Sequence, residues 1–328
     1  MSVEYRAQGR RWPVLAVALS ALVLAWTAAA LWFQFPAVRW LALVLPLVLL
    51  AGLIALSFKG RRAAWLGLAA IVVGVGAWFG ALQPRQDRDW APDVARGVTS
   101  RVEGTKVHLI DVRDFGWITR DEADERWIGT TVDLQQLQTV DLVLTTWGSP
   151  HIAHTMLSFG FADGQYVVLS AEIRREADEA FSELGGFFKQ FELVLIAATE
   201  RDIVRLRTHA RADQVSLHRL EMTPEQRRQL FLSYLELGND LDRKPRWYQT
   251  ITTNCTTVIW RLARLVAPGI PLDWRVLLSG HVPDYLYDIG VIANDRALGD
   301  IKQSARITAK AQALPSDIDY SRGIRQGL

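Results

Sequence analysis

One thiol in this chain stands where it could serve as a nucleophile. Cys255 is the only cysteine in 328 residues, and it lies in a polar turn at 252–257, just before apolar residues that recur at helical spacing. Pro268-Gly269 ends that run, so we expect Cys255 in the first turn of a helix. The free amides and positive dipole end of a helix N-terminus favour thiolate over thiol and could stabilise an oxyanion. The alternative is a small buried side chain without chemistry.

A nucleophilic cysteine needs a base to take its proton, and His154 is the strongest candidate among the six histidines. Residues 153–161 and 166–173 are typical of two strands of a hairpin. Alternate side chains of such a strand point to opposite faces of the sheet. His154 falls on the face with mainly small or polar neighbours, and we expect the other face to form the core.

The turn of this hairpin decides what faces His154. If Ala162-Asp163-Gly164 is a three-residue turn with Gly164 left-handed, His154 lies opposite Glu172. A carboxylate beside an imidazole fixes its tautomer and raises its basicity, as the third member of a catalytic triad does. A two-residue turn would instead set His154 against Ile173 and point Glu172 elsewhere.

Three nearly uncharged apolar runs precede these residues, at 13–33, 38–58 and 63–82. Each is about long enough to cross a hydrocarbon core of ~30 Å, so we predict three membrane helices. Basic residues precede the first run and fill the link between the second and third, which puts everything after Leu82 on the outer side of the membrane. A cleaved signal peptide is the alternative for the first run. These basic residues are Arg6, Arg10, Arg11, Lys59, Arg61 and Arg62.

The hydrophobic pattern divides the chain into four parts. We expect a membrane anchor at 1–82, a polar linker at 83–105, a folded domain at 106–292 and a polar, loosely ordered tail at 293–328. The domain mixes antiparallel strands with helices, which indicates an α+β fold. A net charge of +2 argues against a nucleic-acid partner. The lone cysteine cannot form an internal disulfide, which argues against a role of Cys255 in stability.

Several short segments together resemble the periplasmic domain of the Lnb-type lipoprotein N-acyltransferases, over about 107–292. These segments are Val112-Arg113-Asp114-Phe115, Trp147-Gly148-Ser149-Pro150-His151-Ile152-Ala153-His154-Thr155, Ser170-Ala171-Glu172-Ile173-Arg174-Arg175-Glu176, Phe187-Phe188-Lys189-Gln190-Phe191-Glu192-Leu193, Glu200-Arg201-Asp202 and Thr253-Asn254-Cys255-Thr256-Thr257. That domain is similar to the permuted papain-like fold of the NlpC and lecithin:retinol acyltransferase kind, in which a histidine strand precedes a cysteine helix. The order of His154 and Cys255 agrees with it.

The resemblance implies roles for particular residues. Cys255 becomes the nucleophile, His154 the general base and Glu172 the residue that orients the base. Arg174 and Arg175 become binders of an anionic head group, with salt bridging to nearby acids as the alternative, and Asn254 and His151 join the substrate-binding set. In this family, however, the membrane helices follow the periplasmic domain, whereas here three precede it.

The leading hypothesis is therefore a thiol acyltransferase in the bacterial inner membrane with its domain in the periplasm. It would move an acyl chain from a phospholipid through a Cys255 thioester to an amine such as a lipoprotein N-terminus. A periplasmic cysteine peptidase or amidase and a non-enzymatic membrane scaffold are the alternatives. No cofactor is expected. No metal is expected either, because the spacing of His151, His154 and Cys255 matches no compact zinc motif.

Overall fold

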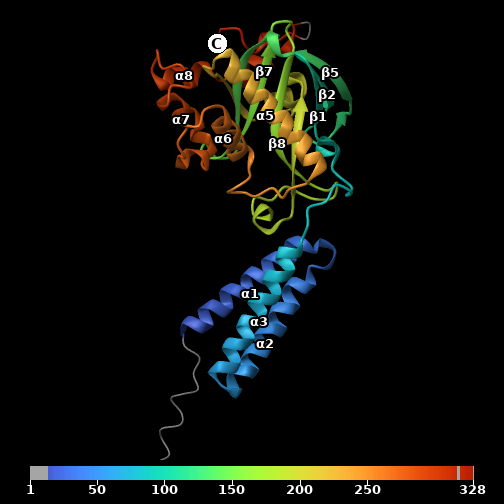
Figure 1. Cartoon of the computed structure of the whole chain (residues 1–328), viewed down its shortest axis with the longest axis vertical. Helices are drawn as coiled ribbons and strands as arrows, with labels where there is room; N and C mark the ends of the chain where they lie inside the picture. The colour runs from blue at the N-terminus through green and yellow to red at the C-terminus, as the bar shows by residue number, and fades with distance from the viewer. Residues whose placement is uncertain (1–13, 316–317, 328) are drawn as a thin grey trace, which may run out of the picture. The chain divides into compact units, whose positions relative to one another are not determined.

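The computed structural model describes residues 14–315 and 318–327 and divides into two compact units (Figure 1). The first unit holds three helices together with Ser182–Gln190. The second holds Arg85–Phe181 and the described residues from Phe191 onward. The three helices are α1 (Val14–Gln34), α2 (Trp40–Lys59) and α3 (Arg61–Ala81).

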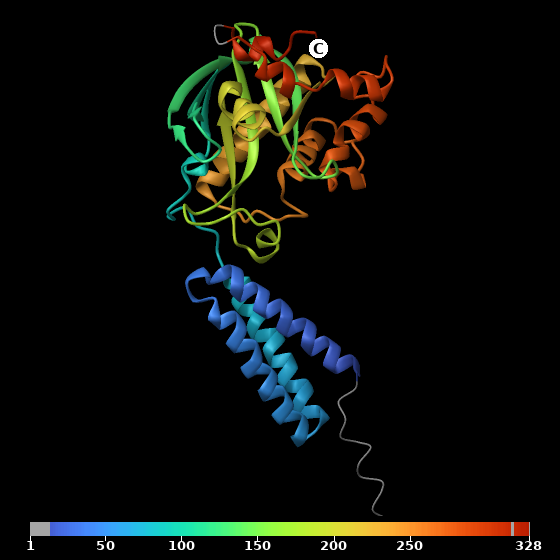
Figure 2. The same cartoon turned by 180° about the vertical axis from the view of Figure 1, so that it is seen from behind.

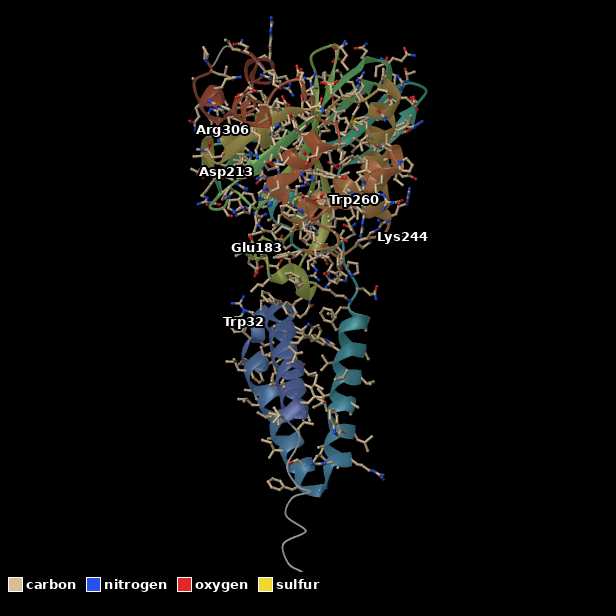
Figure 3. All side chains as sticks on the ribbon, turned by 90° about the vertical axis from the view of Figure 1, so that its left-hand side faces the viewer. Trp32, Glu183, Asp213, Lys244, Trp260 and Arg306 are labelled. Atoms are coloured by element: carbon tan, nitrogen blue, oxygen red, sulfur yellow. The ribbon has the colours of Figure 1, made fainter. Side chains whose placement is uncertain are left out.

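These helices confirm the three predicted apolar segments, since each is 20 or 21 residues long and apolar enough to cross a membrane. Many of their large side chains face outward, as lipid-facing residues do; Val14 and Phe58 are 86 % and 78 % exposed. Trp32 lies near the end of α1 (Figure 3), with the guanidinium of Arg39 4.9 Å above its ring. An aromatic ring beside a cation is typical of the boundary between lipid and water. The expected basic flank at Arg6, Arg10 and Arg11 lies outside the described residues.

The second unit is built on an eight-stranded, mostly antiparallel sheet in the order β1-β2-β9-β8-β7-β6-β10, with β5 paired to β2. Only the pair of β2 and β9 is parallel among the ladders of this sheet. The expected α+β class is therefore confirmed. The strands of this sheet are β1 (Thr99–Glu103), β2 (Lys106–Arg113), β5 (Trp127–Asp133), β6 (Leu137–Thr146), β7 (Ala153–Phe161), β8 (Tyr166–Arg174), β9 (Glu192–Ala198) and β10 (Gln214–Arg219). Two short strands, β3 (Gly116–Trp117) and β4 (Ala123–Asp124), form a separate antiparallel pair.

Helices cover both faces of this sheet. On the side seen in Figure 1, α5 and α6 pack on Leu157 and Phe159 of β7. On the other side, seen in Figure 2, α4, α9 and α10 pack on Met156 of β7 and Val168 of β8. These helices are α4 (Glu200–Arg205), α5 (Pro224–Arg243), α6 (Cys255–Val266), α7 (Val282–Asp288), α8 (Leu298–Ser304), α9 (Thr308–Gln312) and α10 (Tyr320–Gly323).

The covering of both faces corrects one expectation. The face of β7 that carries His154 was expected to be set apart from the core, yet every residue of β7 is buried. The polar side chains on this face are satisfied internally. Ser158 Oγ, for example, donates to Glu200 Oε1 of α4 at 2.5 Å. The C-terminal helices, which supply part of the second cover, were not expected from the sequence.

The β7–β8 hairpin has the three-residue turn. Phe161 N donates to Gln165 O at 2.9 Å, and Gly164 has φ +89°. The register pairs Leu157 with Leu169. Continued toward the open end, it sets His154 opposite Glu172, so the expected register is confirmed. The ladder between the two strands covers only Leu157–Gly160 of β7, although β7 continues to pair with β6 as far as Ala153.

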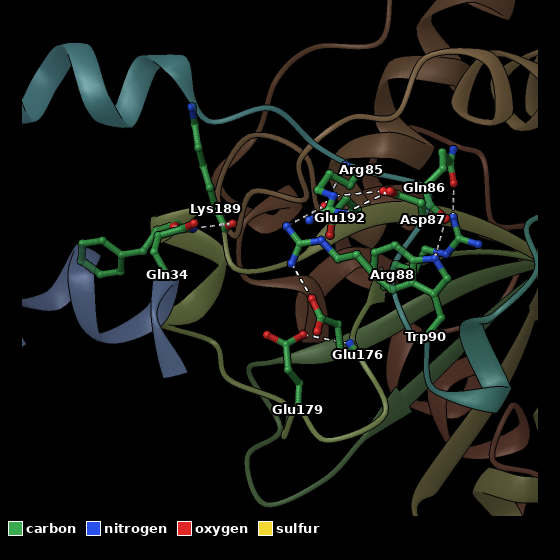
Figure 4. A network of polar contacts seen from close by, with 12 residues as sticks. Gln34, Arg85, Gln86, Asp87, Arg88, Trp90, Glu176, Glu179, Lys189 and Glu192 are labelled. Carbon is green, nitrogen blue, oxygen red and sulfur yellow. Dashed lines mark hydrogen bonds and ion pairs between the residues drawn. The ribbon is translucent and has the colours of Figure 1, made fainter. Parts of the chain in front are cut away.

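The segment 83–105, expected as a linker, is tied into the second unit from Arg85 onward and contains β1. Figure 4 shows Arg88 between two carboxylates: Nη1 lies 2.6 Å from Glu176 Oε1 and Nη2 lies 3.3 Å from Glu192 Oε1. The backbone N–H of Arg85 also donates to Glu192 Oε1. Because Glu192 is 1 % exposed, its carboxylate needs such partners. The charges that suggested a solvated linker are the groups that hold it in place.

The segment 293–328, expected as a loosely ordered polar tail, forms α8, α9 and α10 over its described residues. Three of its isoleucines, Ile301, Ile307 and Ile324, are buried. Arg325 Nη2 lies 2.8 Å from Asp141 Oδ2 and 2.6 Å from Glu200 Oε1. Three widely spaced isoleucines and one inward-pointing arginine thus attach a segment that looks polar in sequence.

This attachment predicts a large stability effect. Arg325→Met should lower the free energy of unfolding of the second unit by about 3 kcal/mol, because it leaves Asp141 and Glu200 buried without this cation. Thermal or urea unfolding of the full chain in detergent, followed by near-UV circular dichroism, measures the change. Arg322→Met, on the exposed side of α10, is the matched control and should stay within about 0.5 kcal/mol of the parent. Equal losses in the two variants would contradict the role given to Arg325.

Candidate active site

Cys255 is the first residue of α6, as its sequence position indicated. The helix begins with a reciprocal cap: Asn254 Oδ1 accepts from Thr257 N at 2.8 Å, and Thr257 Oγ1 accepts from Asn254 N at 2.8 Å. Such a capping box fixes where the helix starts. It therefore fixes the thiol among the first, unpaired amides of the helix. Cys255 is 9 % exposed.

His154 of β7 is held by two groups of β8. Its Nε2 lies 3.0 Å from Glu172 Oε1 and 2.8 Å from Ser170 Oγ, and Ser170 Oγ in turn donates to Glu172 Oε1 at 2.7 Å. This triangle binds one ring nitrogen and leaves Nδ1 for another partner. His154 is 8 % exposed, so the ring is shielded from competing water.

The thiol of Cys255 lies where His154 and Thr155 act on its ionisation, and its sulfur is 3.8 Å from the hydroxyl oxygen of Thr256. The neighbouring hydroxyls of Thr155 and Thr256 are 3.0 Å apart and join β7 to the first turn of α6. The β7–β8 ladder ends at Leu157, and α6 contacts both strands.

The electrostatics of the three groups favour an ion pair of thiolate and imidazolium. Burial alone would lower the pKa of His154, but the Glu172 carboxylate raises it to about 9. Burial alone would raise the pKa of the Cys255 thiol, but His154 and the hydrogen bonds from Thr155 lower it to about 7. Burial likewise opposes ionisation of Glu172, yet His154, Arg207 and Ser170 hold its pKa well below the ordinary value. Near neutral pH a large share of the thiol is therefore ionised beside a protonated His154.

Arg174 and Arg175 lie away from this cluster. The Arg174 guanidinium donates to the carbonyl oxygens of Val94 and Ala95, and its centre lies 4.6 Å above the ring of Trp90. Arg175 Nη2 pairs with Asp93 Oδ1 at 2.9 Å. Both cations are thus bound by residues 90–95 and not brought to Cys255. For Arg175 this is the salt bridge to a nearby acid that was the alternative to head-group binding.

His151 precedes β7 and faces His281 instead of Cys255. His151 Nδ1 lies 2.9 Å from His281 Nε2, and His281 is the last residue of the turn Ser279–His281. Ser279 Oγ bonds to the backbone of Ala153 in both directions, at 2.6 and 2.8 Å. This turn therefore fixes the start of the strand that carries His154. The side chain of Asn254 is likewise used locally, in the cap and by its Nδ2–Thr250 O bond of 2.7 Å.

Three residues of the cluster were missed by the reasoning from sequence: Thr155, Ser170 and Arg207. Ser170 had a usable signal, because it lies two positions before Glu172 and so on the same face of β8. Thr155 adjoins His154 but was assigned to the core. Arg207 Nη2 lies 3.5 Å from Glu172 Oε1, and nothing in its charged neighbourhood distinguishes it from a surface arginine.

Residues 123–280 match the family model described as the Lnb N-terminal periplasmic domain. The matched range contains Cys255, His154, Glu172 and Arg207. Comparison with curated proteins and with solved structures gave no match. The family resemblance expected from the sequence is confirmed, and with the three apolar helices it fits a membrane-anchored protein with a periplasmic domain.

The cluster predicts how the thiol responds to loss of Glu172. In Glu172→Gln the imidazolium loses its stabilising charge, so the pKa of His154 falls and that of Cys255 rises. The rate of alkylation by iodoacetamide at pH 7 should then fall about fivefold for the first unit by which the thiol pKa rises above about 7, and about tenfold for each further unit. Since Cys255 is the only cysteine, alkylation of the full chain reports this thiol alone.

The matched control is Glu236→Gln, which removes an exposed carboxylate of α5 and should leave the pH–rate profile unchanged. Thiolate absorbance near 240 nm gives a second readout. A profile in Glu172→Gln that coincides with that of the parent would show that Glu172 does not govern the pair.

Proposed function

We propose, from the membership of residues 123–280 in the Lnb N-terminal periplasmic domain family, that the protein is a cysteine-dependent acyltransferase of the inner membrane with its active domain in the periplasm. The donor would be a membrane phospholipid and the acceptor an amine such as a lipoprotein N-terminus. The observation that carries the proposal is the placement of Cys255 at the start of α6, where His154 acts on its ionisation, while His154 Nε2 lies 3.0 Å from Glu172 Oε1.

In the first half-reaction the Cys255 thiolate attacks the carbonyl carbon of the acyl ester. The new C–S bond forms, the ester C–O bond breaks, and the leaving alkoxide takes the proton held by His154. The products are a thioester on Cys255 and a lysophospholipid. In the second half-reaction the amine nitrogen attacks the thioester, the C–S bond breaks, and neutral His154 takes a proton from the nitrogen. Cys255 leaves as the thiolate.

The start of α6 supplies donors for the oxyanion of each tetrahedral intermediate. The backbone bonds of α6 begin with Val258 N to Asn254 O at 3.0 Å, and Thr257 N is taken by the Asn254 side chain. The amides of Cys255 and Thr256 precede these and lack helical acceptors. We assign the oxyanion to this pair of amides.

The membrane helices support a lipid donor more than a soluble one. Anchoring a domain by three helices holds it where phospholipid is concentrated, which raises the encounter rate with that substrate without any new contact. A soluble peptide would gain nothing from this anchor. The amine acceptor is assigned from the sequence resemblance.

We also propose that the second unit has a permuted papain-like topology. Three observations support it: the histidine strand precedes the cysteine helix, the nucleophile opens that helix, and the helix packs on an antiparallel sheet beside the histidine strand. In this arrangement the nucleophile and base come from different elements, each anchored in the core.

The central test is capture of the thioester. Incubating the purified full chain with phospholipid labelled in its acyl chain should give a protein-bound label that hydroxylamine releases, because thioesters are cleaved by this nucleophile. Cys255→Ser should lose the hydroxylamine-sensitive label. His154→Gln should slow its formation by about 100-fold or more, since it removes the acid and base.

The matched control is His108→Gln, at a half-exposed histidine of β2, which should retain labelling. Adding a lipidated peptide with a free N-terminus should discharge the label onto the peptide amine. Absence of any adduct in the parent under conditions that allow alkylation of Cys255 would reject acyl transfer. Cleavage of peptides or muropeptides that depends on Cys255 would then favour the amidase alternative.

A further inference from the structure

Arg207 lies next to Glu172 of the candidate site and takes no part in the steps above. Its side chain is 6 % exposed, and its Nη2 lies 3.5 Å from Glu172 Oε1. Its Nε has no hydrogen-bond partner among the described residues. A buried guanidinium with an unpaired donor costs free energy. The ion pair with Glu172 is the interaction that offsets this cost.

The backbone of Arg207 is held in an unusual conformation. Residues Leu206–Ala210 continue α4 as a π-helix, in which Arg211 N donates to Leu206 O at 2.9 Å. Asp213 N donates to Arg207 O at 2.8 Å. Single π turns inside α-helices occur often at functional sites. Here the wide turn places Arg207 on the sheet face that also carries His154, Ser170 and Glu172.

The C-terminal segment holds this turn from outside. Gln312 Nε2 donates to Thr208 O at 2.7 Å, and Tyr320 Oη lies 3.0 Å from Thr208 Oγ1. Thr208 is fully buried. The position of Arg207 is therefore fixed by contacts of its neighbour and its own backbone, while its side chain meets the carboxylate at a distance longer than a strong hydrogen bond.

Charges from several elements surround Arg207 and His154. Glu172 faces both of them, and Cys255 faces His154 from α6. Arg113 of β2 and Arg211 also repel Arg207, whereas Asp213, labelled in Figure 3, attracts it. Arg113 is itself paired with Asp202 at 2.8 Å. Glu172 is the carboxylate that Arg207 and His154 share directly, and the distances place it between them.

We propose that Arg207 is a positioning residue that acts through Glu172: its guanidinium balances the carboxylate and so limits how firmly the carboxylate holds the proton on His154. The four ionised groups then alternate in sign from thiolate to imidazolium, carboxylate and guanidinium, with no net charge to bury. The catalytic consequence rests on the proposed acyl transfer, in which His154 must release a proton and later accept one.

The direction of the effect follows from the charges. Glu172 raises the pKa of His154, and Arg207 lowers it. Arg207 also remains charged at neutral pH, because burial lowers its own pKa only to about 10. Without Arg207 the carboxylate is unopposed, so His154 should keep its proton to higher pH.

The experiment is the pH dependence of Cys255 alkylation by iodoacetamide in the full chain. The rate should rise as the thiol ionises and again as His154 loses its proton, with the upper inflection near the His154 pKa of about 9. Arg207→Met should move the upper inflection upward by about half to one pH unit. Arg207→Lys keeps the charge at a shorter reach and should move it upward by less.

A double-mutant cycle separates this role from a purely structural one. In the Glu172→Gln background each Arg207 variant should move the inflection by clearly less than it does in the parent, because only the direct repulsion between Arg207 and His154 remains. Arg211→Met, which removes an exposed neighbouring cation, is the matched control and should leave the inflection in place.

An upper inflection that is unmoved or lower in folded Arg207→Met overturns the proposal, and so does a shift of equal size in the Glu172→Gln background. If Arg207→Met does not fold, the Arg207→Lys pair of measurements decides in the same way. Alkylation requires no acyl donor, so this outcome is distinguishable from a failure to form the acyl adduct.

Discussion

The early end of the β7–β8 ladder is the constraint on which the candidate site depends. Were the two strands paired as far as Ala153, their backbone groups would bond to each other instead of leaving this part of the sheet open. Because pairing stops at Leu157, α6 contacts both strands, and the thiol comes under the influence of His154 and Thr155. A continuous ladder is normally more stable than an open one. The lost pairing is compensated by side chains, chiefly the triangle of His154, Ser170 and Glu172, which joins the strands where their backbones do not.

Burial of these groups makes their ionisation costly, and other groups of the domain must offset that cost. A carboxylate, an imidazole and a thiol taken out of water each favour their neutral forms, and only mutual compensation keeps them ionised. The same rule governs the framework, where Arg113 meets Asp202, and Arg325 meets Asp141 and Glu200. A domain with a single cysteine has no internal disulfide to hold its segments, and these buried ion pairs fix segments that apolar contacts alone would hold weakly. Such pairs contribute more to a unique arrangement than to net stability.

The sequence predicted the parts of the site that follow from local periodicity. Cys255 at the helix start, the two strands of the β7–β8 hairpin and the register opposing His154 to Glu172 all come from alternation, helical spacing and one three-residue turn. What escaped prediction depends on contacts between distant segments. The partners of Arg174 lie about eighty residues away in a segment that looks like a linker. The π turn that carries Arg207 has no recognisable signature, and the tail looks polar because only a few scattered side chains attach it. Local patterns cannot distinguish an arginine that pairs internally from one that is solvated.

The second unit extends beyond the range that matches the family. The match ends at 280, yet the residues beyond it bear directly on the segment behind the site. Arg325 bonds to Glu200 at the start of α4, and Gln312 and Tyr320 bond to Thr208 in the π turn. Removing these contacts would free both ends of the element that presents Arg207 to Glu172. The helices α9 and α10 therefore act as an outer support for one face of the sheet, while α5 and α6 support the other. Because the charges of the site lie between these two layers, its geometry depends on both being closed.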